Sequence, residues 1–293
     1  MNNPLRFLFV CTGLILILQQ GCFKRHILSD SDIEAHYEKK KFRPRFGKYP
    51  LNDTSGVHFA LSGPDTLPLV VLIHGAPGAW YGYMEYVDDT LLQKHMQLLS
   101  VDRPGYGKSG RRAVTSIEEQ ARRIHPLIDS MRHGRRVLVV GRSYGAPIAA
   151  RLAADYPQDV SELVLIAPAV APELEKFWWF SKPVNSNWMR WMFPAAINRA
   201  SDEKFTHREE LRRLEPLWDS IRAPITAVQG DNDAIADTAN LTWLQRKLTD
   251  KKHRFIRLKG VGHMITEERP EFVQQLLTSK ADSLRAWQPA PRQ

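Results

Sequence analysis

The chain is poor in cysteine and in metal-ligand patterns. Only Cys11 and Cys22 occur in 293 residues, and both lie at the N-terminal end. A disulfide framework in the rest of the chain is therefore excluded, and stability has to come from a hydrophobic core. The histidines have no spacing typical of metal ligands, so we expect no metal site. Basic and aromatic residues do not interleave as they do at nucleic-acid interfaces, so we expect no nucleic-acid partner.

The N-terminal apolar stretch is too short to span a bilayer as a helix. It runs for about twelve residues, from Phe7 to Leu18, and follows the single positive charge of Arg6, as in a signal segment. It ends in Gln19-Gln20-Gly21-Cys22, which resembles a bacterial lipoprotein processing site, although Gln19 stands where leucine is usual. We therefore expect residues 1–22 to be a leader and Cys22 to carry a lipid that anchors an exported envelope protein in the membrane. Simple secretion, a periplasmic form and an uncleaved anchor are the alternatives.

Composition favours one domain with an insertion. Hydrophobic residues make up 43% of the chain, which allows one sizeable core. The net charge of +9 comes from basic clusters that lie far apart, such as Arg111-Arg112 and Lys251-Lys252. Scattered charge is typical of a solvated surface, and a basic face attracted to anionic lipid is the alternative.

Short apolar runs alternate with helical patterns after residue 50, which predicts an α/β fold with a mostly parallel central sheet flanked by helices. Residues 23–50 are polar and predict a tether or the start of an edge hairpin. We expect core segments at 51–170 and 223–287. The expected strands are Leu69–Ile73, Met96–Val101, Val137–Val140, Leu163–Ala167, Ile225–Gln229 and Phe255–Leu258. Ser116 and Glu119 form a capping-box pattern that predicts the start of a helix.

The alternation fails between residues 171 and 222, which predicts a cap or lid inserted into the core. This stretch holds five of the eight tryptophans: Trp178, Trp179, Trp188, Trp191 and Trp218. They either pack the cap onto the core or line a pocket for an acyl or aromatic group. We take the first four as candidate substrate-binding residues.

Residues 141–145 carry the strongest chemical signal, because they read G-R-S-Y-G directly after an apolar run. A G-x-S-x-G between a strand and a helix is typical of a nucleophile elbow, a turn too tight for side chains at the flanking glycines. Such a turn exposes the Ser143 hydroxyl and directs the Tyr144 amide to where a carbonyl oxygen would lie. A serine needs a base, and the base needs an orienting acid. Asp233 and His263 each follow a later expected strand, in the order serine, acid, histidine.

Together these residues resemble the α/β-hydrolase superfamily over roughly residues 50–285. Two further motifs add to the resemblance, H-G-A-P-G at 74–78 and D-R-P-G-Y-G-K-S at 102–109. The resemblance implies that the Ala76 N–H joins the Tyr144 N–H in an oxyanion hole. Its usual G-x-x-D spacing favours Asp233 over Asp231 as the acid. It also implies that His74 is structural, and that Asp102 belongs to a wall of the site.

The expected function is a serine hydrolase that cleaves a small-molecule carboxylic ester or related acyl compound through an acyl-enzyme, without a cofactor. The serine argues against epoxide hydrolases and dehalogenases of this fold, which place aspartate at the elbow. Carbon–carbon bond hydrolases, perhydrolases and proline-releasing aminopeptidases stay open as alternatives. An aminopeptidase would need acidic residues in the cap, for which the candidates are Glu203, Glu209 and Glu210. A non-catalytic envelope binding protein is the alternative from another class.

Overall fold

The structure is a computed structural model that describes residues 28–51, 55–176 and 190–286. The chain divides into two units, residues 1–43 and residues 44–293. In the described part of the first unit, helix α2 (Asp30–Glu38) begins at a capping box in which Ser29 and Asp32 exchange hydrogen bonds. The sequence predicts no helix here, because α2 is short and its residues are mostly polar.

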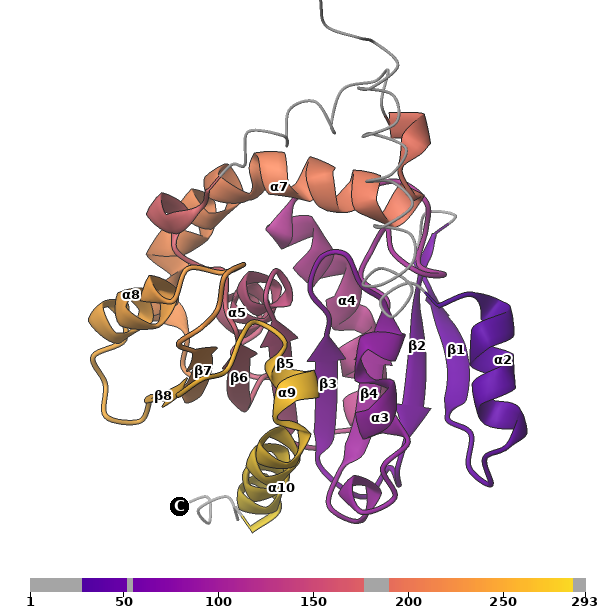
Figure 1. Cartoon of the computed structure of the whole chain (residues 1–293). Helices are drawn as coiled ribbons and strands as arrows, with labels where there is room; N and C mark the ends of the chain where they lie inside the picture. Colours follow the sequence, from indigo (N-terminus) through magenta and orange to yellow (C-terminus); the bar gives the residue numbers. More distant parts are fainter. Residues whose placement is uncertain (1–27, 52–54, 177–189, 287–293) are drawn as a thin grey trace, which may run out of the picture. The chain divides into compact units, whose positions relative to one another are not determined.

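The second unit is built on one eight-stranded sheet with the order β1-β2-β4-β3-β5-β6-β7-β8 (Figure 1). The strands are β1 (Arg45–Pro50), β2 (Gly56–Ser62), β3 (Leu69–Ile73), β4 (Gln97–Val101), β5 (Val137–Arg142), β6 (Glu162–Ile166), β7 (Ile225–Gly230) and β8 (Arg254–Leu258). The first hairpin is antiparallel, and β2 is antiparallel to β4. Every other pairing is parallel. The predicted α/β fold with a mostly parallel sheet is confirmed.

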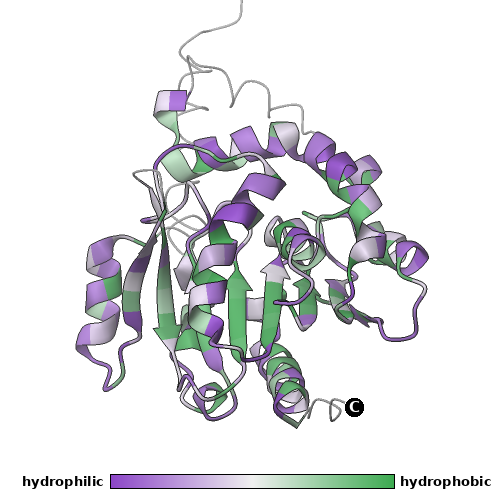
Figure 2. Ribbon diagram, turned by 180° about the vertical axis from the view of Figure 1, so that it is seen from behind, coloured by the Kyte–Doolittle hydropathy of each residue, from purple (hydrophilic) through white to green (hydrophobic). Residues whose placement is uncertain are grey.

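Helices connect the parallel strands and cover the sheet. The longer ones are α4 (Ile117–Arg132), α5 (Gly145–Asp155), α7 (Ala195–Leu214), α8 (Ala239–Lys247) and α10 (Pro270–Ala286). The short ones are η1 (Trp80–Tyr83), α3 (Met84–Val87), η2 (Leu92–Lys94), η3 (Pro172–Leu174), η4 (Arg190–Met192), η5 (Glu215–Ser220) and α9 (Ile265–Glu268). Helix α4 lies on the face turned to the viewer in Figure 2, and the strands behind it are strongly hydrophobic. Among the residues described, no helix is long and apolar enough to cross a bilayer.

Two local features refine these expectations. Strand β8 ends the sheet, and its Arg254 and Arg257 are exposed. The capping box at α4 is only half formed: the Ser116 hydroxyl accepts from the Glu119 N–H, but the Glu119 carboxylate binds arginines one turn further on. Opposite charges at i+3 and i+4 compete successfully with a backbone N–H for that carboxylate.

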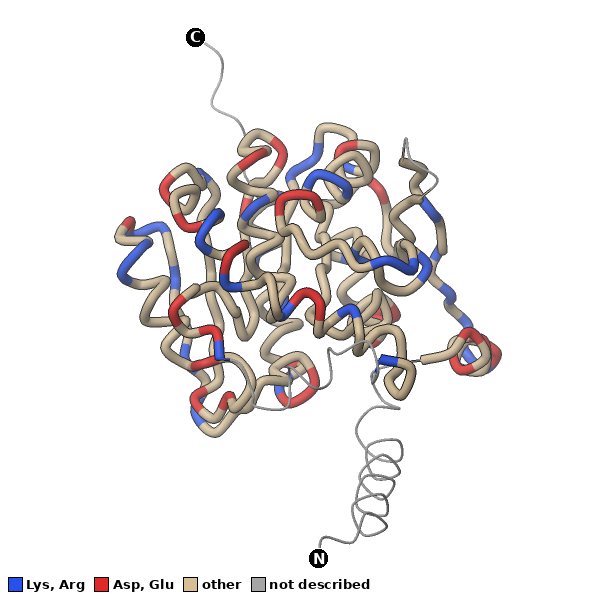
Figure 3. The backbone as a smooth tube through the Cα atoms, turned by 90° about the horizontal axis from the view of Figure 1, so that it is seen from above, with Lys and Arg blue, Asp and Glu red and all other residues tan. Residues whose placement is uncertain are grey.

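The surface charge is mixed. Figure 3 shows basic and acidic residues beside one another on most elements, as the scattered clusters of the sequence predicted. Several of the exposed arginines pair within their own helix, as Arg122 does with Glu119. Such pairs contribute little stability, but they reduce the charge that a partner would encounter.

Candidate active site

The loop after β5 has the strained geometry of a nucleophile elbow. Ser143 has φ +53°, a backbone conformation that non-glycine residues rarely adopt. A Cβ on Gly141 would lie 2.4 Å from the Gly145 carbonyl oxygen, and one on Gly145 would lie 2.4 Å from the Ile73 carbonyl oxygen. Both approaches are to backbone, so neither can be relieved by a rotamer change. Glycine is therefore required on both sides of Ser143, as the sequence pattern indicated.

Two backbone donors lie free beside this serine. The loop after β3 passes so close that a Cβ on Gly75 would be 3.1 Å from Ser143 Cβ and 3.6 Å from its Oγ. Within the described part of the chain, neither the Ala76 N–H nor the Tyr144 N–H donates to a backbone carbonyl. Backbone N–H groups of a folded chain are usually paired, so two without a carbonyl acceptor beside one hydroxyl fit a site for an oxygen ligand.

Asp233 and His263 are in direct contact, on the loops that follow β7 and β8. The distance between His263 Nδ1 and Asp233 Oδ2 is 2.8 Å, and both side chains are nearly buried. The other oxygen, Asp233 Oδ1, accepts from the Ile235 and Ala236 N–H groups. An ionised carboxylate can only accept, so His263 carries its proton on Nδ1 and leaves Nε2 free to accept a proton.

Gln229 is a further hydrogen-bond donor to the Asp233 carboxylate. Its Nε2 donates to Asp233 Oδ2 over 2.7 Å from the last part of β7. Burial raises the pKa of Asp233, but the hydrogen bond and charge of His263 and the two backbone donors outweigh it, so the pKa is lowered. The acid therefore stays ionised when His263 becomes positive.

The structure separates Asp233 from the residues that competed for its role. Asp231 Oδ1 accepts from the Gly260 N–H, so this side chain ties two loops together and does not contact the imidazole of His263. Asp102 is held by His58 and by the Trp80 and Lys108 N–H groups.

His74 lies in the loop after β3 and has both ring nitrogens engaged. Its Nε2 accepts from the Arg103 N–H, so Nδ1 carries the proton and donates to the Gly75 carbonyl over 2.7 Å. Burial, followed by the charge of Arg103, holds the pKa of His74 well below its usual range. A permanently neutral histidine with both nitrogens engaged cannot serve as the base.

The three expected catalytic side chains come from the carboxyl ends of strands in one sheet. Asp233 and His263 meet, whereas in the residues described here Ser143 Oγ forms no hydrogen bond with His263. Catalytic hydrogen bonds are often long before substrate binds. The assignment of Ser143, Asp233 and His263 to a triad, with Ala76 and Tyr144 as oxyanion donors, stays a prediction that this geometry supports.

Comparison with known proteins agrees with the fold. The model of a family described as alpha/beta hydrolase fold matches residues 68–201. The chain has the α/β-hydrolase fold. It is 25% identical to monoacylglycerol lipase abhd6-B of Xenopus laevis over 269 residues, 76% of this chain and 78% of the lipase. The crystal structure of a bacterial membrane phospholipase A matches with a TM-score of 0.66 and 22% identity, over 96% of this chain and 99% of the other. The monoacylglycerol lipase of Paleococcus ferrophilus matches with a TM-score of 0.58 and 21% identity, over 76% and 98%. These two structural likenesses establish the fold alone.

Helix α7 of this hydrolase is tied to the core by a buried ion pair. Arg103 and Glu203 are both fully buried and share two hydrogen bonds, of 2.6 and 3.0 Å. Tyr106 and Gln120 also donate to Glu203, over 2.6 and 2.9 Å. Further along the helix, Glu210 accepts from the N–H of Ile117 at the start of α4. No sequence pattern predicted this arrangement, because its members are far apart in the chain.

A second ionic cluster lies one helical turn further along α7. Glu175 is nearly buried and contacts Lys204 and His207. Burial raises the pKa of Glu175, but hydrogen bonds and charges from these two neighbours outweigh it and lower the pKa to about 2. The ring of His207 also stacks on Tyr144, with ring centroids 4.4 Å apart. Tyr144, which follows Ser143, is thus packed against α7.

The five tryptophans of the expected cap differ in their surroundings. Trp178, Trp179 and Trp188 lie outside the described residues, and Trp191 is 81% exposed. Trp218 is buried and packs edge-on against Trp243 of α8, which is a core contact. The proposed substrate-binding role of the first four stays a prediction.

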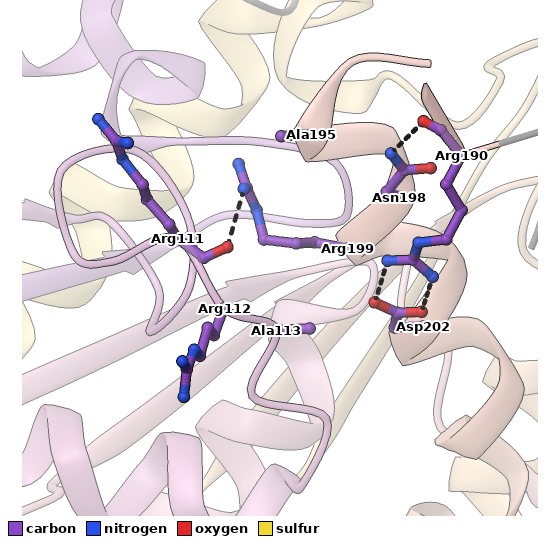
Figure 4. A pocket seen from close by; sticks show the side chains of 8 residues that line it. All are labelled: Arg111, Arg112, Ala113, Arg190, Ala195, Asn198, Arg199 and Asp202. Atoms are coloured by element: carbon purple, nitrogen blue, oxygen red, sulfur yellow. Dashed lines mark hydrogen bonds and ion pairs between the residues drawn. The ribbon is translucent and has the colours of Figure 1, made fainter. Parts of the chain in front are cut away.

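A cavity of about 440 Å³ lies between the 111–113 loop and the beginning of α7 (Figure 4). Arg199 crosses it from α7 and donates to the Arg111 carbonyl, while Arg190 forms a two-pronged ion pair with Asp202. Arg111 and Arg112 point away from each other in Figure 4. The cavity is therefore not lined by converging cations. In the parts of the chain that the structure describes, no group of three metal-ligating side chains occurs.

Proposed function

We propose that this protein is a serine hydrolase that cleaves carboxylic esters through an acyl-enzyme, with a monoacylglycerol-type ester as its substrate class. The observation that carries the proposal is the elbow at Ser143, with two free N–H groups beside it and a buried Asp233–His263 pair on neighbouring loops. The named activity of the relatives, monoacylglycerol lipase, supports the choice of substrate class.

The proposed reaction uses only residues of this chain. His263 Nε2 removes the proton from Ser143, whose Oγ attacks the ester carbonyl carbon. The negative oxygen is bound by the Ala76 and Tyr144 N–H groups, each worth about 3 kcal/mol at such sites. The tetrahedral intermediate collapses, and His263 gives the proton to the departing alcohol. Water, deprotonated by the same nitrogen, then releases the acid and restores the serine.

The structure weakens one alternative. An aminopeptidase would need free carboxylates in the cap to bind a substrate amine. Glu203 is neutralised by Arg103, and Glu210 is occupied by Arg213 and a backbone N–H. Glu209 is exposed and lies close to two arginines. A carbon–carbon bond hydrolase or a perhydrolase would use the same geometry, so a substrate panel has to separate them.

The test compares wild type with Ser143→Ala on monooleoylglycerol and p-nitrophenyl butyrate, together with labelling by a fluorophosphonate. Ser130→Ala is the matched control, because this hydroxyl only bonds within α4. We expect wild type and the control to turn over ester and to label, and Ser143→Ala to do neither. Equal turnover by Ser143→Ala would refute the assignment, and an unlabelled, inactive wild type would favour a non-catalytic binding protein.

Membrane anchoring is a separate part of the proposal. Residues 1–22 would act as the leader, and Cys22 would carry the lipid; both lie outside the described residues. Metabolic labelling with a palmitate analogue should tag wild type and not Cys22→Ser. An untagged wild type that still sediments with membranes would instead support an uncleaved anchor.

A further inference from the structure

Arg103 contacts both arms of the expected oxyanion hole, and we propose that it is a positioning residue for that site, held in place by Glu203 of the cap helix. This inference rests on the proposed serine-hydrolase function. It concerns how the Gly75–Ala76 peptide and Tyr144 are fixed, and it gives the cap a role in the chemical step besides any contact with substrate.

The first arm is the peptide unit that joins Gly75 to Ala76. Its carbonyl oxygen accepts from Arg103 Nη2 over 3.1 Å and from His74 Nδ1 over 2.7 Å. The N–H of the same planar unit belongs to Ala76, the expected oxyanion donor. Two donors on the oxygen prevent the peptide from rotating, so they fix the direction of the N–H. They also polarise the unit, since hydrogen bonds in a chain strengthen one another.

The second arm is Tyr144. The guanidinium of Arg103 lies 4.8 Å from the centre of the Tyr144 ring and 4.5 Å from that of Tyr106. Cations are attracted to aromatic faces, so this contact holds the residue that follows the nucleophile. The backbone N–H of Arg103 also donates to His74, which sets the tautomer that the first arm needs. One residue thus positions both donors.

Glu203 keeps this arginine where it is. The two side chains form a forked pair, and Glu203 also accepts from Tyr106 and Gln120. Replacing a buried ion pair by well-packed apolar residues often leaves the stability of a protein unchanged or raises it. Stability is therefore a poor explanation for the Arg103–Glu203 pair. A role in fixing the oxyanion loop explains the position of the Arg103–Glu203 pair. It also explains the arginine, because a lysine would keep the charge but could not form the two-pronged contact.

The test uses Arg103→Lys and Glu203→Gln, with Arg190→Lys as the matched control. Arg190 forms the same kind of forked pair with Asp202 in the cap, without touching the oxyanion loop. Ser143 is labelled with diethyl p-nitrophenyl phosphate, which leaves a stable phosphoryl group whose oxygen occupies the oxyanion hole. The readouts are the ³¹P chemical shift of that group, kcat and KM for p-nitrophenyl butyrate, and thermal unfolding.

We expect Arg103→Lys and Glu203→Gln to lower kcat at least tenfold, to change KM less than twofold and to move the ³¹P resonance. The control, Arg190→Lys, should change none of these. Unchanged kcat and ³¹P shift in folded Arg103→Lys and Glu203→Gln, with an active wild type, would overturn the inference. A loss of thermal stability without a change in the ³¹P shift would also overturn it, because that is the result of a purely structural role. Failure of wild type to react with the phosphate reagent would refute the proposed function instead.

Discussion

Asp233→Asn should abolish most of the activity by reversing the tautomer of His263. The carbonyl oxygen of the introduced amide would accept from Ile235 and Ala236, as Asp233 Oδ1 does now. The NH₂ of that amide would then face His263 Nδ1 over the present 2.8 Å. Two donors cannot share that contact, so Nδ1 would become the acceptor and the proton would move to Nε2.

The size of the effect follows from this exchange. A histidine protonated on Nε2 cannot remove the serine proton, and a substitution of this kind lowers kcat by about 10⁴-fold. That factor corresponds to about 5.5 kcal/mol of lost transition-state stabilisation. The fold should survive, because Gln229 can turn its amide and offer Oε1, which has no partner among the described residues, to the new NH₂.

Asp231→Asn is the matched control, two positions away and of the same chemistry. Its Oδ1 would still accept from the Gly260 N–H, so loop geometry and activity should be kept. The assay is kcat for p-nitrophenyl butyrate between about pH 6 and pH 9, because the pH dependence of kcat reports on the catalytic base. Circular dichroism checks that each variant is folded. The reasoning would be refuted if Asp233→Asn retained more than a tenth of wild-type kcat, or if Asp231→Asn lost as much as Asp233→Asn.

Two further predictions concern stability. Gly145→Ala should destabilise the protein by about 2 kcal/mol or more, because the new Cβ would overlap the Ile73 carbonyl oxygen. Gly82→Ala is the control, because its Cβ would meet only ordinary contacts, and thermal unfolding of both variants tests the difference. The second prediction concerns Glu175, whose pKa of about 2 in the folded protein lies below its ordinary value of 4.5. The ionised Glu175 therefore stabilises the folded state fully above pH 4.5, and this contribution is lost as the pH falls toward 2. Between pH 4.5 and pH 2, the free energy of unfolding of wild type should fall by about 3 kcal/mol more than that of Glu175→Gln. Urea titrations measure this difference, and the control variant Glu173→Gln should behave as wild type. Parallel curves for Glu175→Gln and wild type would contradict the assigned ion pairs.

The sequence was informative where chemistry constrains neighbouring residues. The glycines at 141 and 145 could be read from the pattern, because a tight turn forbids a Cβ at fixed distances from the serine. The six parallel strands could be read from apolar runs, and the structure moves their ends by only one or two residues. Strand β1 lacked such a run, because it lies at the edge of the sheet and carries exposed residues such as Arg45 and Lys48.

Contacts between distant segments could not be predicted in this way. Arg103 and Glu203 are 100 positions apart, and an isolated arginine in a loop gives no hint of a buried partner. Gln229 is a milder case, because its place immediately before the acid loop could have indicated a role beside Asp233. Local pattern determines local geometry, whereas a tertiary ion pair depends on how an insertion docks.

The docking of α7 has a consequence for protein engineering. Exchanging the insertion with that of a relative is an attractive way to change specificity, because the junctions at Ala171 and Ala223 lie next to core strands. A transplanted insertion without a carboxylate at the position of Glu203 would leave the buried guanidinium of Arg103 without a counter-ion. Successful chimeras should therefore transfer residues 102–109 together with the insertion, as one exchangeable module.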